Sequence, residues 1–158
     1  MGETARDVMA TRFFTLRPET SIAGAVQVFR QASQETQQRV FGLMVTEANG
    51  RLVGMLSMYD ILLFIRPKHI NIWGEMSDLE LSGLFAAACR RGKGTLVGDI
   101  MTTDLTTITP DTHLLLIIDI MIKKHVRRIP VLEDDRVVGI VYLSTVFDHL
   151  LDKLTGVG

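Results

Sequence analysis

The chain has 158 residues, enough for one domain of ordinary size or for two small halves that share a core. Hydrophobic residues make up 47% of it and charged residues 22%, as in globular proteins dissolved in water. The net charge of −1 argues against general attraction to nucleic acid or to a membrane, and a single cysteine excludes an internal disulfide. The first ten residues have no signal-peptide pattern, so we expect a cytoplasmic protein.

In the first half, which we take as residues 1–65, the sequence pattern predicts strands and helices in the order β-α-β-β-α. A short strand at Thr15 and Leu16 ends before a proline, which cannot donate to a sheet. Thr20 or Ser21 then stands where a helix N-cap belongs. "FGLMV" and "RLVGML" flank the turn "TEANG" as in a β-hairpin, and "MYDILLFI" forms a closing helix. The first helix should bury the apolar residues that recur at helical spacing, which are Ile22, Ala25, Val26 and Phe29.

We predict that residues 66–97 form a linker that contains one helix. Ser77 or Asp78 would cap this helix, and Arg90 and Arg91 would lie at its C-terminus, where positive charge suits the helix dipole. The linker also contains Trp73, the only tryptophan, whose role the sequence leaves open. The predicted buried side consists of Leu79, Leu81, Leu84 and Phe85.

The second half, residues 98–158, predicts the same order of elements. Thr107 and Ile108 form the first strand, Thr112 caps the helix, and "IPVL" and "VVGIV" form the hairpin around "EDD". The helix at 114–122 is apolar nearly all round, yet it is too short to cross a membrane. We therefore expect it to be covered by the other half and by a second copy of the chain.

The two halves form an internal repeat. Residues 7–20 align without gaps on residues 99–112, and "RVFGLMVTEANGRLVGML" aligns on "HVRRIPVLEDDRVVGIV" with one extra turn residue. The first copy has six further residues within "QASQETQQR". The fold class is therefore α/β (α+β), with two β-α-β-β-α repeats that share one core. Five aligned pairs are identical: Asp7 and Asp99, Met9 and Met101, Thr15 and Thr107, Pro18 and Pro110, and Thr20 and Thr112.

This repeat, with "DIMT", a strand before proline, "RRIPV" and "VVGIV" followed by a helix, resembles the CBS-domain pair, or Bateman module. The resemblance covers about residues 6–65 and 98–152. It implies a pseudo-twofold module with two clefts between the repeats, which in many members bind AMP, ADP, ATP or S-adenosylmethionine. It also implies a homodimer that regulates a partner protein and has no catalytic activity of its own.

The ligand motif of that family is Gly, two apolar residues, Ser or Thr, any two residues and Asp. The sequence matches it from Gly54 to Asp60, with Ser57 at the hydroxyl position. By resemblance, Asp60 accepts hydrogen bonds from the ribose, while Thr15 and Leu16 lie on a strand beside the adenine. Ser-x-x-Asp is also the pattern of a helix capping box, and a core strand would account for Leu16 equally well.

The second half lacks this motif, because Tyr142 and Thr145 align on Ser57 and Asp60. Neither residue supplies an ionised carboxylate, so we expect one strong nucleotide site per chain. Thr145 and Asp148 offer a substitute capping box, from which we expect helix capping in both halves. A competing alignment, which inserts three residues, would match Asp148 with Asp60.

The stretch "KKHVRRIPV" is strongly basic. By resemblance, Arg127 and Arg128 contact ligand phosphates, for which the planar guanidinium is well suited. A solvated helix end is the alternative, and we assign Lys123 and Lys124 to it.

The spacing of the histidines predicts no metal site, and no nucleophile signature is present. The rival functions are a ligand-free dimerisation or docking module, then a nucleic-acid binder and, last, an enzyme. The four histidines are His69, His113, His125 and His149.

Overall fold

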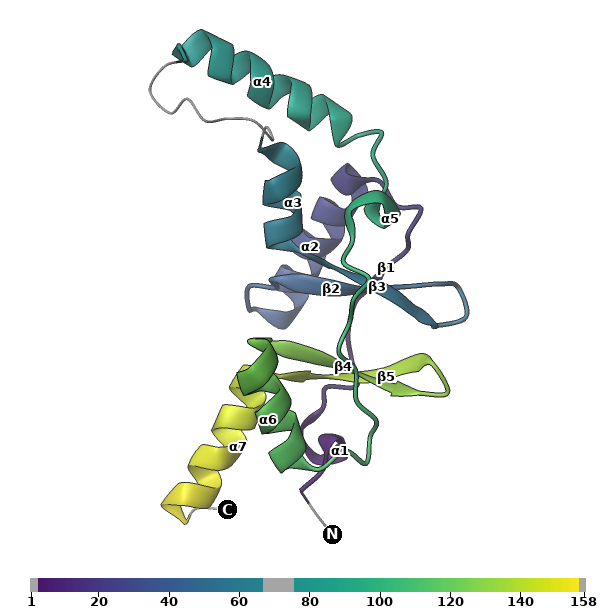
Figure 1. Ribbon diagram of the computed structural model, residues 1–158, viewed down its shortest axis with the longest axis vertical. Helices are drawn as coiled ribbons and strands as arrows, with labels where there is room; N and C mark the ends of the chain where they lie inside the picture. Colours follow the sequence, from purple (N-terminus) through teal and green to yellow (C-terminus); the bar gives the residue numbers. More distant parts are fainter. Residues whose placement is uncertain (1–2, 67–75, 157–158) are drawn as a thin grey trace. The chain divides into compact units, whose positions relative to one another are not determined.

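The computed structural model describes residues 3–66 and 76–156, and Figure 1 shows its helices and strands. Trp73 and His69, singled out in the sequence, lie outside the described residues. The chain divides into two compact units. Unit 1 contains Met1–Phe13, Asn49–Leu52 and Thr106–Gly158, and unit 2 contains Phe14–Ala48 and Val53–Leu105. Within the described ranges, no helix is both long and apolar enough to span a bilayer.

Unit 2 is built on a three-stranded sheet in the order β1-β2-β3 (Figure 1). β1 (Thr15–Leu16) runs parallel to β2 (Gly42–Thr46), and β3 (Leu52–Ser57) follows β2 through a turn in which Gly50 has a φ of 87°. This positive φ explains the glycine of the predicted turn. The helices of this unit are α2 (Ile22–Thr36), α3 (Met58–Ile65), α4 (Asp78–Arg91) and the short α5 (Val97–Ile100).

The core of unit 2 confirms most of the predicted face of α2. Ile22, Ala25 and Phe29 are buried together with Leu56 of β3, whereas Val26 is 42% exposed. Ser21 is the N-cap, since its Oγ accepts a hydrogen bond of 3.0 Å from the Gly24 N–H.

Unit 1 is built on an antiparallel hairpin. β4 (Arg128–Glu133) and β5 (Arg136–Tyr142) are joined by Asp134 and Asp135, whose φ values of 53° and 65° are those of a two-residue hairpin turn. The predicted strand at Thr107–Ile108 is reduced to one parallel bridge, between Ile108 and Val131. The helices are the short α1 (Ala5–Val8), α6 (Leu114–Lys124) and α7 (Leu143–Thr155).

The short helices α1 and α5 start the two copies of the repeat, yet each belongs to the unit built on the other copy's hairpin. In unit 1, Met9 lies against Gly139, where an added Cβ would stand 2.9 Å from the Met9 sulfur. In unit 2, Met101 lies against Gly54, where the same distance would be 2.5 Å. These matched contacts confirm the alignment of Met9 with Met101 and explain both glycines, because a side chain would displace the methionine.

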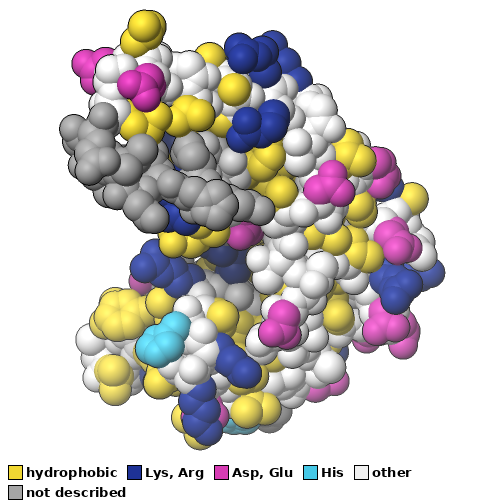
Figure 2. Space-filling view, turned by 45° about the horizontal axis from the view of Figure 1, so that its top comes forward, with side chains coloured by type: hydrophobic (Ala, Val, Ile, Leu, Met, Phe, Trp, Pro, Cys, Tyr) yellow, Lys and Arg dark blue, Asp and Glu magenta, His cyan; other side chains and the backbone are white. Residues whose placement is uncertain are grey.

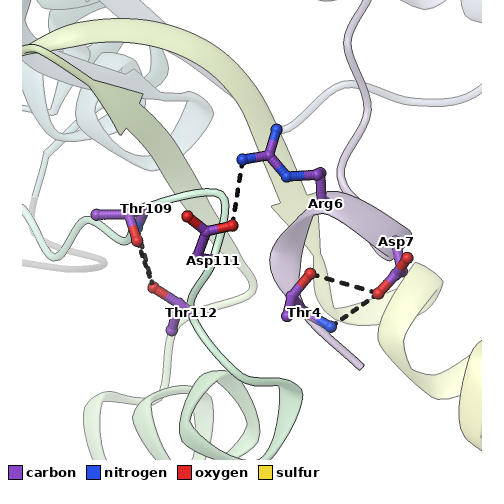
Figure 3. A network of polar contacts seen from close by, with 6 residues as sticks. All are labelled: Thr4, Arg6, Asp7, Thr109, Asp111 and Thr112. Carbon is purple, nitrogen blue, oxygen red and sulfur yellow. Dashed lines mark hydrogen bonds and ion pairs between the residues drawn. The ribbon is translucent and has the colours of Figure 1, made fainter. Parts of the chain in front are cut away.

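Polar contacts attach α1 to the loop before α6 within unit 1 (Figure 3). The Ala5 N–H donates to the Thr112 carbonyl over 2.9 Å, and Arg6 forms an ion pair of 3.2 Å with Asp111. Asp7 accepts from the Thr4 N–H over 2.9 Å, which closes the first turn of α1.

The predicted cap of α6 is wrong. Thr112 is bonded to Thr109 and does not cap the helix. The cap is His113, whose Nδ1 accepts from the Leu115 N–H over 3.0 Å. The Thr112 hydroxyl is instead used within the loop that precedes the helix.

The linker helix α4 begins at the predicted cap, Ser77, and Arg90 and Arg91 occupy its last turn. Its predicted buried side is wrong, because Ala88 is its only buried residue within the described chain. Arg91 lies over the Phe64 ring of α3, with 5.8 Å from the guanidinium carbon to the ring centre. The apolar residues of the predicted side, Leu79, Leu81, Leu84 and Phe85, are exposed instead. Figure 2 shows that apolar side chains lie among charged ones on the visible surface of the molecule.

Candidate functional site

Ser57 and Asp60 lie at the junction between β3 and α3 in unit 2. The Ser57 Oγ accepts from the Asp60 N–H over 3.0 Å, and Asp60 Oδ2 accepts from the Ser57 N–H over 2.8 Å. The two side chains therefore form a complete capping box at the start of α3. This fixes both rotamers and holds the carboxylate of Asp60 at the positive end of the helix.

The Asp60 carboxylate is distinguished from similar groups by its burial. At the starts of α1, α4 and α5 the carboxylates of Asp7, Glu80 and Asp99 also accept from the N-cap backbone N–H, and all three of these residues are exposed. Asp60 is half-buried, and its second oxygen, Oδ1, has no hydrogen bond to the described residues. A half-buried carboxylate with an unused oxygen can accept a hydrogen bond from a ligand hydroxyl.

Thr15 and Leu16 form β1 in the same unit, where they pair with Met44 and Val45 of β2. Leu16 is 2% exposed and belongs to the core, so its side chain supports the sheet. Thr15 is half-buried and precedes it on the strand. Of the two, only Thr15 presents a partly accessible side chain.

Arg127 and Arg128 belong to unit 1, at the start of β4. Arg127 is exposed, and its carbonyl accepts from the Leu143 N–H over 2.8 Å. Arg128 is half-buried and lies opposite Tyr142 in the β4–β5 ladder. Burial raises the pKa of the Tyr142 hydroxyl, and the positive charge of Arg128 opposes this rise. The Tyr142 side chain is therefore uncharged at physiological pH.

The start of α7 differs from the expectation of a cap in both halves. Tyr142 is the N-cap, and no side chain makes a cap hydrogen bond there. Thr145 lies inside the helix, so Thr145 and Asp148 do not form the substitute capping box that we predicted. Because Ser57 and Tyr142 both end the second hairpin strand and precede the helix, the gap-free alignment is correct and the competing one is wrong.

Two features were missed in the sequence. Phe41 is the counterpart of Arg127, since its carbonyl accepts from the Met58 N–H over 2.8 Å, and it is 54% exposed. Comparing the two aligned copies at this position could have identified it. Glu3 contacts His149 and Lys153 of α7, with 3.1 Å between the Glu3 and Lys153 side chains. No local pattern links residues so far apart in the chain.

The profile described as "CBS domain" matches residues 5–67 and 97–152. The chain belongs to the CBS-domain family. Its two matched regions form a CBS pair, with an α/β fold and an internal repeat, which confirms the predicted fold class and family. The motif residues Gly54 to Asp60 lie within the first matched region, and both arginines lie within the second.

This CBS pair is similar to the "CBS domain-containing protein CBSX2, chloroplastic" of Arabidopsis thaliana. They are 25% identical over 155 residues, which cover 89% of this chain and 60% of the relative. The chain thus spans about 60% of the length of that curated relative. The crystal structure of CBSX2 matches with a TM-score of 0.73 and 26% identity, over 98% of this chain and 99% of the other. CBSX2 in complex with AMP matches with a TM-score of 0.70 and 27% identity, over 96% and 98%.

Proposed function

We propose that this CBS pair is a non-catalytic regulatory module that binds an adenosine-containing ligand, with Asp60 as the ribose acceptor. The half-buried Asp60 carboxylate, with one oxygen still without a hydrogen bond to the described residues, is the observation that carries the proposal. The similarity to CBSX2, which has been crystallised with AMP, supports the ligand class. We expect AMP, ADP, ATP or S-adenosylmethionine, without a required cofactor or metal.

The capping box and the ribose contact are compatible. Asp60 Oδ2 accepts from the Ser57 N–H, while Oδ1 is available to accept from a ribose hydroxyl. A hydrogen bond to a charged acceptor contributes about 1.5–3 kcal/mol, more than a bond between neutral groups. In this proposal Ser57 positions the carboxylate, and Thr15 adds a polar contact from β1.

Arg127 and Arg128 are proposed to bind phosphate groups of the ligand. The exposed guanidinium of Arg127 can donate two parallel hydrogen bonds to phosphate oxygens. We propose the same role for Arg128. Its charge acts on the Tyr142 hydroxyl, which is neutral and so does not compete with a phosphate for the guanidinium.

The experiment that tests the proposal is titration calorimetry with the four ligands on the parent protein and on Asp60→Asn. Asparagine preserves the size of the side chain and one oxygen that can accept from the Ser57 N–H, but it removes the negative charge. We expect one tight site per chain and a loss of at least about tenfold in affinity, which is roughly 1.4 kcal/mol. Thr145→Ala, at the aligned position of the other repeat, is the control and should bind as the parent does. An Asp60→Asn protein with parental affinity would reduce Ser57 and Asp60 to a helix cap.

The second candidate function is a ligand-free dimerisation or docking module. It is favoured by apolar residues exposed on the two helices of unit 1, such as Leu115 of α6 and Phe147 of α7, with exposed fractions of 71% and 59%. We propose that these helices form a homodimer whether or not a ligand binds. We propose that the module regulates a partner protein in the cytoplasm.

A further inference from the structure

A hollow of about 620 Å³ lies beside the C-terminal half of α2 in unit 2. We call it the α2 hollow. Its size is within the range of small-molecule sites. It contains none of the six residues proposed above for the adenosine ligand. Its described lining consists of Val26, Phe29, Arg30, Ser33, Gln34, Gln37, Gln38, Arg39 and Met58.

Four residues of the lining, Ser33, Gln34, Gln37 and Gln38, lie in the segment that the second repeat lacks. Helix α2 has 15 residues and α6 has 11, so four of the six extra residues lengthen the helix and two lengthen the following turn. Both helices end at a residue with positive φ, Gln37 at 56° and His125 at 53°. The aligned end of the helix is therefore displaced by one turn in the first repeat.

The turn that borders the α2 hollow is held in place by side chains of α2. The Val40 N–H donates to the Ser33 Oγ over 3.0 Å. The Thr36 hydroxyl donates to the Ala32 carbonyl over 2.7 Å and lies 3.3 Å from the Gln38 carbonyl. These bonds fix the backbone of the turn that carries Gln37, Gln38 and Arg39, so the turn does not have to be ordered when a ligand binds.

The polar part of the lining is cationic. Arg30 and Arg39 are both accessible at the surface, and neither has an ion-pair partner among the described residues. None of the described residues that line the hollow is acidic. Two guanidinium groups at one hollow repel each other unless an anion lies between them. Their planar donors match carboxylate and phosphate oxygens, and three glutamine amides add hydrogen-bonding groups.

The floor of the hollow is apolar. Phe29 is 5% exposed in the core, Val26 is 42% exposed, and Met58 packs against the same core. A methionine adapts to irregular apolar shapes because its side chain is unbranched and flexible. An inorganic ion would leave this floor uncovered, whereas an organic anion would cover it.

We infer that the α2 hollow binds a small organic anion, whose carboxylate or phosphate group is held by Arg30 and Arg39 and whose apolar body covers Val26, Phe29 and Met58. This site is separate from the adenosine site and belongs to the first repeat alone. The proposed function above can fail without affecting it, because no residue is shared.

The test uses naphthyl phosphate and naphthoate as probes, with naphthol and inorganic phosphate as their apolar and charged parts. Nuclear magnetic resonance of the isotope-labelled full chain follows the side-chain amides of Gln34, Gln37 and Gln38. We expect one or both organic anions to shift these signals in a saturable way, and naphthol and phosphate to bind at least about tenfold more weakly. The ratio between the two anions identifies the preferred head group.

The double variant Arg30→Gln and Arg39→Gln should lose at least about tenfold in affinity for the preferred probe. Its matched control removes two other exposed arginines of unit 2, in the double variant Arg66→Gln and Arg90→Gln, and should bind as the parent does. The inference is overturned if the first double variant keeps parental affinity. It is also overturned if naphthol or inorganic phosphate binds as tightly as the organic anions, or if the shifted signals lie away from the hollow.

Discussion

Ser57 and Tyr142 occupy the same position in the two repeats, but only the Ser57 side chain makes a hydrogen bond to the helix that follows it. Each ends the second strand of its hairpin and is the N-cap of the next helix. Ser57 Oγ accepts from the Asp60 N–H over 3.0 Å, whereas the cap of α7 has no side-chain hydrogen bond. The two copies have therefore diverged in helix capping as well as in the carboxylate.

The first prediction concerns the stability that this cap contributes. Ser57→Ala should lower the free energy of unfolding by about 1 kcal/mol, because the Asp60 N–H loses its acceptor. Ser144→Ala is the matched control, since Ser144 is exposed in the first turn of α7 and makes no cap bond. Urea unfolding of both variants and the parent measures the difference. Equal losses in the two variants would contradict the role of Ser57.

The second prediction separates the phosphate from the nucleoside. Arg127→Ala should weaken AMP binding by about fivefold or more and leave adenosine binding nearly unchanged, because only AMP offers a phosphate to the guanidinium. Lys124→Ala removes a neighbouring exposed charge and should change neither affinity. Calorimetric titrations with the two ligands decide the matter. Loss of both ligands to the same extent would assign Arg127 a structural role instead.

The third prediction concerns the stability of the fold at low pH. Hydrogen bonds from His149 and then Lys153 hold the pKa of Glu3 below its ordinary value of 4.5. A carboxylate whose pKa is lowered by folding stabilises the fold above its ordinary pKa and loses this effect as the pH falls through the folded value. The difference in melting temperature between the parent and Glu3→Gln should therefore be present near neutral pH and shrink below about pH 4.5.

The control for this prediction is Glu19→Gln, a surface glutamate without an ion pair among the described residues. Its melting temperature should follow that of the parent across the same acid range. Glu3 is 39% exposed, so we expect a modest effect. If the difference between Glu3→Gln and the parent did not shrink below about pH 4.5, the ionised carboxylate of Glu3 would not stabilise the fold.

Local signals in the sequence predicted much of this fold. The duplicated segments, the two hairpins and the caps at Ser21 and Ser77 all depend on residues close together in the chain. The Ser57–Asp60 pair was found because a capping box and a ligand motif use the same spacing. The partial burial of the Asp60 carboxylate depends on tertiary packing, so the sequence could not show it.

Features that depend on distant packing were not predictable in the same way. The apolar spacing of α4 indicated a buried face, yet Leu79 and Phe85 are 84% and 61% exposed. Periodicity shows that a helix has an apolar side, but not that the described chain covers it. The placement of α1 beside α7 and of α5 beside α3 depends on tertiary contacts and has no local signature. The cap at His113 was missed because histidine is rarely considered as a side-chain acceptor for a helix.

The last prediction is that the protein is a homodimer through α6 and α7. The inner residues of α6, Leu114, Ile117 and Met121, are buried, so its outer side would normally be polar. Instead, Leu115 and Ile122 are 71% and 66% exposed. Burying one such side chain against a second copy contributes about 1.5–3 kcal/mol, and several of them together can hold a dimer.

Light scattering at about micromolar concentration should therefore give twice the 17.6 kDa of the chain. The double variant Leu115→Glu and Phe147→Glu should dissociate into monomers, because association would bury two unpaired charges in each chain. Leu79→Glu, which changes an exposed leucine of α4, is the matched control and should remain dimeric. A parent protein of 17.6 kDa would exclude the dimer, and a dimeric double variant would place the interface on another surface.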